Sequence, residues 1–213
     1  MTGNILFWIG IGILVIIVVL AILMQLPALK GWFGERLVRG VLKSLPKDKY
    51  IILNDLMFYG REKENAGPGR YRGKRWSCQI DHLVISPYGI FCIETKNYLG
   101  VIAGNYRDKN LQRRVLWMRY PSYSPIYQNY RHLERLVERF PRIRAKAKDL
   151  HSIVCFIPPV TLKIKGGGAA VICKFPQLRE NIRKYQRDVL SWSECNEIAD
   201  DIRKVSVNHK PMK

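Results

Sequence analysis

A run of 20 residues without a charged side chain, from Ile5 to Met24, is the feature that most limits what this chain can be. A helix of that length spans roughly 30 Å, the thickness of the hydrocarbon core of a bilayer. No Lys or Arg precedes the run and no small-residue cleavage site follows it, so it resembles a retained anchor more than a signal peptide. Lys30, Arg36, Arg39 and Lys43 follow the run. The positive-inside rule then predicts a single-pass membrane protein with its C-terminal domain in the cytoplasm.

The whole chain is strongly basic. Its 213 residues include 36 Lys and Arg against 17 Asp and Glu, which gives a formal net charge of +19. Such an excess favours a polyanionic partner, either nucleic acid or an anionic membrane surface. A basic surface without a specific partner is the alternative, because net charge biases non-specific binding without proving a function.

The cysteines indicate a reducing compartment. Their number is odd and no C-x-x-C pair occurs, so neither a disulfide framework nor a zinc site is expected. Buried free thiols are the simpler interpretation. The five cysteines are Cys78, Cys92, Cys155, Cys173 and Cys195.

The order of apolar patterns predicts one α/β (α+β) domain, with a mixed β-sheet flanked by helices, after the membrane helix. The length allows a single sizeable core plus an appendage. The linker after the anchor should cover residues 25–33. Helices are expected near 34–45, 124–140, 177–187 and 191–205, and strands near 50–58, 79–85, 90–96, 99–104, 106–120, 151–157 and 169–175.

Three charged residues interrupt the two apolar strands between Gln79 and Asn97. They are Asp81, Glu94 and Lys96. If Ser86 to Gly89 form a tight turn, Asp81 lies opposite Glu94 and Gln79 lies opposite Lys96, on one face of the hairpin.

Two carboxylates opposite each other repel, so a fold keeps such a pair only when a cation compensates it or one acid stays protonated. Lys96 supplies one positive charge from the same face as Glu94. A magnesium ion would supply two, and it prefers oxygen ligands and retains waters for a phosphate substrate. Glu35 leans towards the apolar face of its helix and could join them; an acid that simply favours the helix N-terminus is the alternative.

Four short motifs resemble the nuclease-related domain family, NERD, which belongs to the PD-(D/E)xK restriction-endonuclease-like superfamily. The motifs are Gly34-Glu35, QIDH at 79–82, GIFCIETKN at 89–97 and SPIYQ at 124–128. Ser124-Pro125 stands where the family usually has Asn-Pro, which leaves the helix cap intact. The resemblance divides the chain into an anchor (1–27), a NERD nuclease-like core (28–158) and a C-terminal strand and helices that complete the domain (159–213).

The resemblance implies metal-dependent hydrolysis of phosphodiester bonds, with DNA as the expected nucleic acid. Asp81, Glu94, Glu35 and the Thr95 carbonyl would hold Mg²⁺, with Mn²⁺ as a substitute. Lys96 would orient the attacking water, since adjacent acids oppose the lowered pKa that a base needs. Gln128 would position a phosphate or the water, or simply cap its helix.

Two rival interpretations stay open at this stage. The protein could be a catalytically inactive nucleic-acid-binding module tethered to the membrane, or a surface that binds anionic lipid, although the latter leaves the acids in the strands unexplained. His82 points to the opposite strand face and is read as structural. The aromatic residues of 121–131 and the basic residues of 131–148 suit nucleic acid or an ordinary solvated surface equally.

Overall fold

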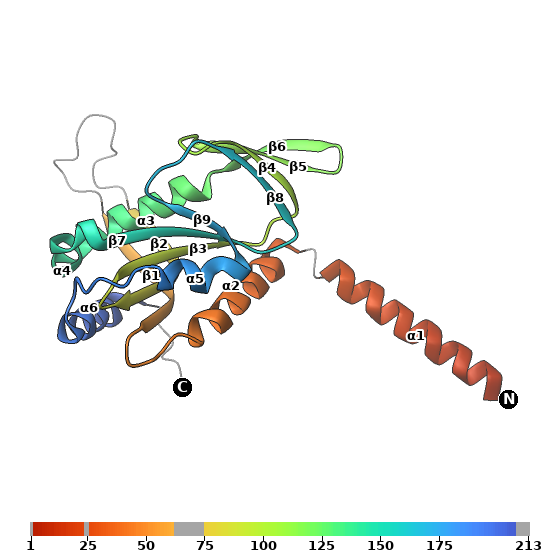
Figure 1. Ribbon diagram of the computed structural model, residues 1–213. Helices are drawn as coiled ribbons and strands as arrows, with labels where there is room; N and C mark the ends of the chain where they lie inside the picture. Colours follow the sequence, from red (N-terminus) through yellow and green to blue (C-terminus); the bar gives the residue numbers. More distant parts are fainter. Residues whose placement is uncertain (1, 24–25, 62–74, 208–213) are drawn as a thin grey trace.

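The computed structural model of the protein describes residues 2–23, 26–61 and 75–207, which form two β-sheets, their flanking helices and an N-terminal helix (Figure 1). The helices are α1 (Thr2–Leu23), α2 (Pro27–Lys43), α3 (Pro125–Arg139), α4 (Pro141–Ala145), α5 (Leu178–Arg183) and α6 (Trp192–Val205). The strands are β1 (Ile51–Arg61), β2 (Arg75–Ser86), β3 (Gly89–Lys96), β4 (Gly100–Asn105), β5 (Asn110–Val115), β6 (Met118–Tyr123), β7 (Leu150–Phe156), β8 (Val160–Lys165) and β9 (Val171–Lys174). The mixed α+β class expected from the sequence is confirmed.

The larger sheet has the strand order β1-β2-β3-β7-β9. Strand β2 runs antiparallel to both β1 and β3, whereas β3, β7 and β9 are mutually parallel. The central strand β3 is buried on both faces, because Phe91 and Ile93 pack with residues of α2 and α5 while Ile90 and Cys92 pack with α3, α4 and α6. Covering both faces requires a near-continuous apolar strand, which the sequence of β3 provides.

The second sheet, of order β6-β5-β4-β8, was not expected. Ile102, Leu111 and Val160 of this sheet form a small core with Ile126 of α3 and Phe156 of β7. The parallel pairing of β4 with β8 holds it together. Strand β8 was missed because its short alternating apolar and charged residues give little signal until a partner strand and a face to cover are known.

The hairpin register is confirmed over most of its length, from Ser86 opposite Gly89 to His82 opposite Ile93. The pairing of β2 with β3 ends there, so the next expected pairs, Asp81 with Glu94 and Gln79 with Lys96, are not part of the ladder. The backbone N–H of Thr95 instead donates to the Asp81 carboxylate at 2.8 Å. Direct opposition of Asp81 and Glu94 would set like charges face to face, so the strands separate where the acids begin.

Two helix boundaries also differ from expectation. The linker assigned to residues 25–33 is largely helical, since α2 begins at Pro27. Proline is favoured at the first position of a helix, which explains the early start. The helix expected over 177–187 is limited to Leu178–Arg183.

The N-terminal apolar run forms α1, whose described side chains are Asn4 and residues 7–19. Its large apolar side chains in that range are exposed, for example Trp8 at 67% and Leu14 at 61%. Within the described part of the chain, no helix reaches the length and hydropathy of a membrane span. Met24, the last residue of the expected anchor, lies outside the described residues.

Asn129 fastens α3 to the two central strands. Its side chain is fully buried, and Nδ2 donates to the Cys92 carbonyl at 2.9 Å and to Ser152 Oγ at 2.8 Å. The Cys92 thiol in turn donates to Asn129 Oδ1 at 3.1 Å. This buried polar network fixes how α3 lies on the sheet, because each buried polar group needs its partner.

We expect Asn129→Ala to lower the free energy of unfolding by about 1–3 kcal/mol, since it leaves buried acceptors unpaired. Urea denaturation followed by circular dichroism measures this. The control is Asn196→Ala in α6, whose exposed amide donates to Trp192 O at 2.8 Å and should cost less than about 0.5 kcal/mol. Equal losses in the two variants would contradict the assigned role of Asn129.

His82 is fully buried, with Nδ1 at 2.7 Å from Asn54 Oδ1 and no hydrogen-bond partner for Nε2 among the described residues. Burial, aided by the charge of Arg39, lowers the pKa of His82 from 6.5 to about 3. The imidazole is therefore neutral in the folded protein at neutral pH, in keeping with a structural role.

His82 should weaken the fold in acid. As the pH falls from about 6.5 towards 3, His82 is protonated in the unfolded chain but stays neutral in the folded protein. The free energy of unfolding therefore decreases across that window. His82→Gln should remove up to about 1.4 kcal/mol per pH unit from the slope of unfolding free energy against pH. Urea denaturation at several pH values gives the slope, and a wild-type slope in the variant would refute the prediction.

Candidate active site

A cavity of about 350 Å³ lies where the end of β3 meets the first turns of α2 and α3 and the strand β5. All six residues that the sequence proposed for catalysis or metal binding line it. They are Glu35, Asp81, Glu94, Thr95, Lys96 and Gln128. The other lining residues are Lys30, Gly31, Gln79, Asn97, Tyr98 and Arg113.

Glu94 is the buried centre of the site, with only 1% of its surface exposed. Its Oε1 lies 2.5 Å from Lys96 Nζ, and its Oε2 lies 3.3 Å from His132 Nε2. Burial alone would raise the pKa of Glu94, but His132 and Lys96 outweigh it and the pKa is lowered. Apart from this contact with His132, Oε2 has no hydrogen-bond partner among the described residues.

Asp81 approaches the same point from β2. Its Oδ2 accepts the Thr95 N–H at 2.8 Å, which occupies the backbone donor that the hairpin ladder leaves free. Burial and then the neighbouring charge of Glu94 raise the pKa of Asp81 well above its usual range. The two acids therefore repel each other, and additional positive charge at the cavity would relieve that repulsion.

Glu35 is placed by the close packing of α2 on the end of β3. A side chain on Gly34 would meet Asn97 Cβ at 3.0 Å, so glycine permits the approach. Asn97 also donates its Nδ2 to the Lys30 carbonyl at 2.9 Å, which ties the first turn of α2 to β3. Burial, followed by the charge of Asp55, raises the pKa of Glu35. Glu35 thus lies towards the cavity, as the helical spacing suggested.

Lys96 and Gln128 contact each other at the mouth of the site. Lys96 Nζ donates to Gln128 Oε1 at 3.1 Å as well as pairing with Glu94. Burial would lower the pKa of Lys96, but the Glu94 carboxylate outweighs it and the pKa is raised. Ser124 caps α3 by accepting the Tyr127 N–H at 3.4 Å, which sets Gln128 in the first turn. Lys96 is therefore protonated at neutral pH, and two contacts hold its ammonium group.

Sequence reasoning missed His132, which lies directly behind Glu94. Its Nδ1 is 3.1 Å from the Cys78 thiol. Burial would lower the pKa of His132, but the contacts with Cys78 and Glu94 raise it to about 9. The spacing of four residues from Gln128 places both on one helix face, and this was the available signal.

Sequence reasoning also missed Arg113, which enters the cavity from the second sheet. Its guanidinium lies 4.5 Å from the centre of the Tyr98 ring and 5.5 Å from that of Tyr120. Its Nε donates to the Leu99 carbonyl at 3.3 Å. Nothing in the linear sequence links Arg113 to Glu94, because the contact depends on how the two sheets meet.

The oxygen donors of the cavity suit a hard divalent cation. Glu94 Oε2 is buried and, apart from its contact with His132, lacks a hydrogen-bond partner in the described chain, and Asp81 lies beside it on the neighbouring strand. The described residues hold no cluster of three or more His, Cys, Asp or Glu side chains arranged for a metal ion. Two carboxylates and a backbone carbonyl with several waters is a ligand set that magnesium accepts.

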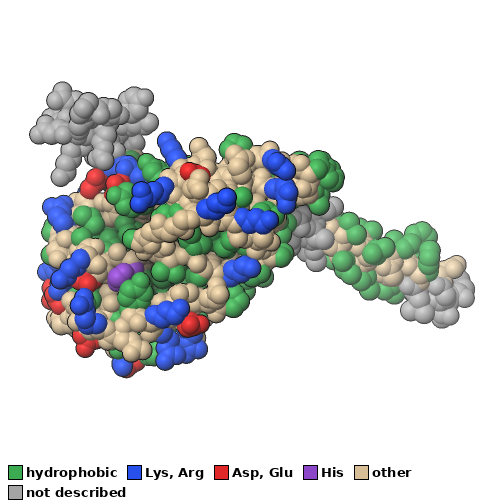
Figure 2. Space-filling model, turned by 45° about the horizontal axis from the view of Figure 1, so that its top comes forward, with side chains coloured by type: hydrophobic (Ala, Val, Ile, Leu, Met, Phe, Trp, Pro, Cys, Tyr) green, Lys and Arg blue, Asp and Glu red, His purple; other side chains and the backbone are tan. Residues whose placement is uncertain are grey.

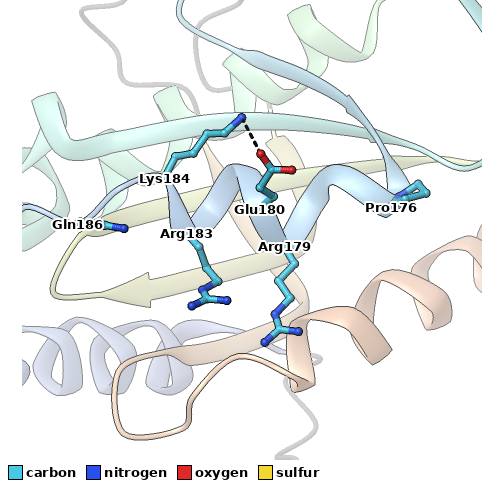
Figure 3. A pocket seen from close by; sticks show the side chains of 6 residues that line it. All are labelled: Pro176, Arg179, Glu180, Arg183, Lys184 and Gln186. Carbon is cyan, nitrogen blue, oxygen red and sulfur yellow. Dashed lines mark ion pairs between the residues drawn. The ribbon is translucent and has the colours of Figure 1, made fainter.

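A second hollow of about 430 Å³ lies along α5 (Figure 3). It contains one acid, Glu180, which is paired with Lys184 at 3.5 Å. Arg179 and Arg183 extend from the same helix. None of the proposed site residues lines this hollow, so its arginines belong to a surface separate from the candidate active site.

Comparison with known proteins agrees with the resemblance seen in the motifs. Residues 30–157 match the family model of the nuclease-related domain. An uncharacterized protein of Bacillus anthracis is 30% identical over 112 residues, which are 53% of this chain and 47% of the relative. The chain thus spans about half the length of that relative. No solved structure gives a significant match.

The match to residues 30–157 covers more than half of the 213 residues and includes every residue that lines the first cavity. The chain therefore belongs to the nuclease-related domain (NERD) family.

Proposed function

We propose that this protein is a metal-dependent nuclease that hydrolyses phosphodiester bonds of nucleic acid. The observation that carries the proposal is the convergence of Asp81, Glu94 and Lys96 on one cavity. Buried acids that repel each other beside a fixed lysine cost stability, and such arrangements are typical of functional sites. Membership of the nuclease-related family supports the same class of reaction.

Magnesium is the proposed cofactor, with manganese as a substitute. Asp81, Glu94 and the Thr95 carbonyl would hold it, with Glu35 near enough to the cavity to bind one of its waters. When bound, the ion would polarise the phosphate and lower the pKa of a water molecule. The extra positive charge would also offset the repulsion that raises the pKa of Asp81.

Lys96 acts in this proposal through charge and orientation. Its raised pKa keeps it protonated, so it offsets charge that develops on the phosphate and does not abstract a proton. Gln128 holds the ammonium group from the other side and so limits its positions. Arg113 adds a second cation whose plane is fixed between two tyrosine rings, which suits a phosphate oxygen.

DNA is the nucleic acid that we propose as substrate. The net charge of +19 suits a polyanion, and Lys and Arg side chains spread over the molecular face that Figure 2 shows. The membrane placement is also a proposal. The run from Ile5 to Met24 carries no charge and its described side chains are exposed, so we infer an anchor with the domain at the cytoplasmic face.

Replacement of the site residues should abolish cleavage by the full chain in detergent micelles. Asp81→Asn and Lys96→Ala should each reduce the cleavage rate of plasmid and single-stranded DNA by at least about 100-fold. Asp200→Asn and Lys163→Ala are the matched controls, since both side chains are exposed away from the cavity. If the wild-type protein binds DNA in a salt-sensitive way without cleaving it, it is the alternative, an inactive tethered binding module.

Asp81→Asn should also leave the metal-free protein as stable as the wild type or more stable. The amide oxygen can still accept the Thr95 N–H, while the buried charge beside Glu94 is gone. Thermal unfolding in EDTA measures this. A large loss of stability in this variant would show that the charge of Asp81 is structural and would weaken the catalytic assignment.

Removal of the metal should stop the reaction reversibly. EDTA should abolish cleavage, and excess Mg²⁺ or Mn²⁺ should restore it, because two carboxylates and Lys96 alone do not activate a water molecule in this proposal. Mg²⁺ should also raise the unfolding temperature of the wild type but not that of Asp81→Asn. Full cleavage in EDTA would refute the metal dependence.

A further inference from the structure

The hairpin of β5 and β6 ends in a strongly exposed apolar tip. Leu116, Trp117 and Met118 are consecutive and are exposed by 74%, 83% and 51%. Figure 2 shows an apolar area at this end of the second sheet, with Lys and Arg side chains beside it. Three large apolar side chains exposed to water add nothing to the core, so they indicate a binding surface for a ligand or a partner.

Two arginines sit directly behind this tip. Arg114 of β5 and Arg119 of β6 are opposite each other in the hairpin, and both are exposed. Neither forms an ion pair with another residue in the described part of the chain. Like charges directly opposite destabilise a strand pair, and a bound anion would reverse that effect. The hairpin therefore combines an apolar tip with a pair of exposed arginines on one face of its stem.

The same hairpin forms one wall of the candidate active site. Arg113 lines the cavity that holds Asp81 and Glu94, whereas Arg114 and Arg119 lie on the other face of the hairpin, because side chains alternate along a strand. Arg113 is opposite Tyr120, and the next opposed pair on that face is Val115 and Met118. Leu116 and Trp117 form the turn, one step beyond that pair, so Trp117 lies three residue steps, or about 10 Å, along the hairpin from Arg113. That distance is about three stacked nucleotides at 3.4 Å each.

We propose that the β5–β6 hairpin holds the nucleic-acid strand that leaves the active-site cavity, with an unpaired base stacked on Trp117 at the tip and with Arg114 and Arg119, on the face away from Arg113, on the phosphates beyond that base. The inference rests on the proposed function and narrows its substrate to nucleic acid with unpaired nucleotides about three positions from the cleaved bond. Single strands and duplexes with overhangs belong to this class, and a blunt duplex does not. Stacking on an exposed tryptophan needs a free base face, which paired and stacked bases lack.

A membrane surface is the other class of partner that an apolar tip flanked by arginines suits. Continuity with the cavity favours nucleic acid. Arg113 contacts the rings of Tyr98 and Tyr120 and lines the cavity of the acids, so one face of the hairpin stem borders the candidate active site. Insertion of the tip into a membrane is therefore the competing result that the experiment must distinguish.

The test uses the full chain in phosphatidylcholine nanodiscs, with EDTA present, and fluorescence anisotropy of labelled DNA. The probes are a single strand, an overhang duplex and a blunt duplex of one sequence. Trp117→Ala should weaken binding of the first two about tenfold and of the blunt duplex less than about twofold. Trp192→Ala, an exposed tryptophan of α6, is the matched control and should bind as the wild type.

The arginines are tested by charge-matched double variants. Arg114→Ala with Arg119→Ala should reduce the slope of log affinity against log salt by about 1.4 for the single strand. Arg179→Ala with Arg183→Ala removes the same charge from the surface along α5 and should leave the slope unchanged.

Three results would overturn the inference. The first is equal DNA affinity of the Trp117→Ala and Trp192→Ala variants, and the second is no binding of any probe by the wild type. The third is quenching of Trp117 fluorescence by brominated lipid while Trp117→Ala leaves the DNA affinity unchanged, which would assign the tip to the membrane. Cleavage by the wild type in Mg²⁺ is read separately. Binding that depends on Trp117 without cleavage would refute the nuclease and keep the hairpin assignment, whereas cleavage with unaltered binding by Trp117→Ala would do the reverse.

Discussion

The parallel pairing of β3 with β7 is the interaction on which the candidate site depends. It extends from Ile90 opposite Leu150 to Lys96 opposite Phe156, three residues beyond the last pair of β3 with β2. The end of β3 is therefore supported on one side and open on the other. Thr95 turns its free N–H to the Asp81 carboxylate, and the open side becomes the cavity.

The acids at this end of the sheet are unequally compensated. Lys96 and His132 flank Glu94, while Asp81 and Glu35 remain as acids whose pKa is raised by burial and by neighbouring carboxylates. The cations compensate Glu94 more fully than the other two acids. In our proposal the remaining repulsion between the acids is relieved when a metal ion and the substrate bind.

The second sheet adds a wall that the core of the fold does not itself supply. It brings Arg113 to the cavity and projects the β5–β6 hairpin beside it. Strand β8, which completes this sheet, lies beyond the segment that matches the family, as does β9 at the edge of the larger sheet. Strand β8, outside the matched segment, thus supports the sheet that carries Arg113 and the β5–β6 hairpin, which we propose bind the substrate.

The sequence by itself determined the class of fold, the turn and register of the β2–β3 hairpin near Ser86 to Gly89, the capped start of α3 and the six residues of the site. These follow from local periodicity and turn chemistry, or from short motifs in order along the chain. Only the tertiary structure decided that the strands part at Asp81, that β4 pairs with β8, and that His132 and Arg113 reach the acids. The physical reason is that these contacts join residues distant in sequence, whose meeting depends on how two sheets and a helix pack and leaves no local pattern.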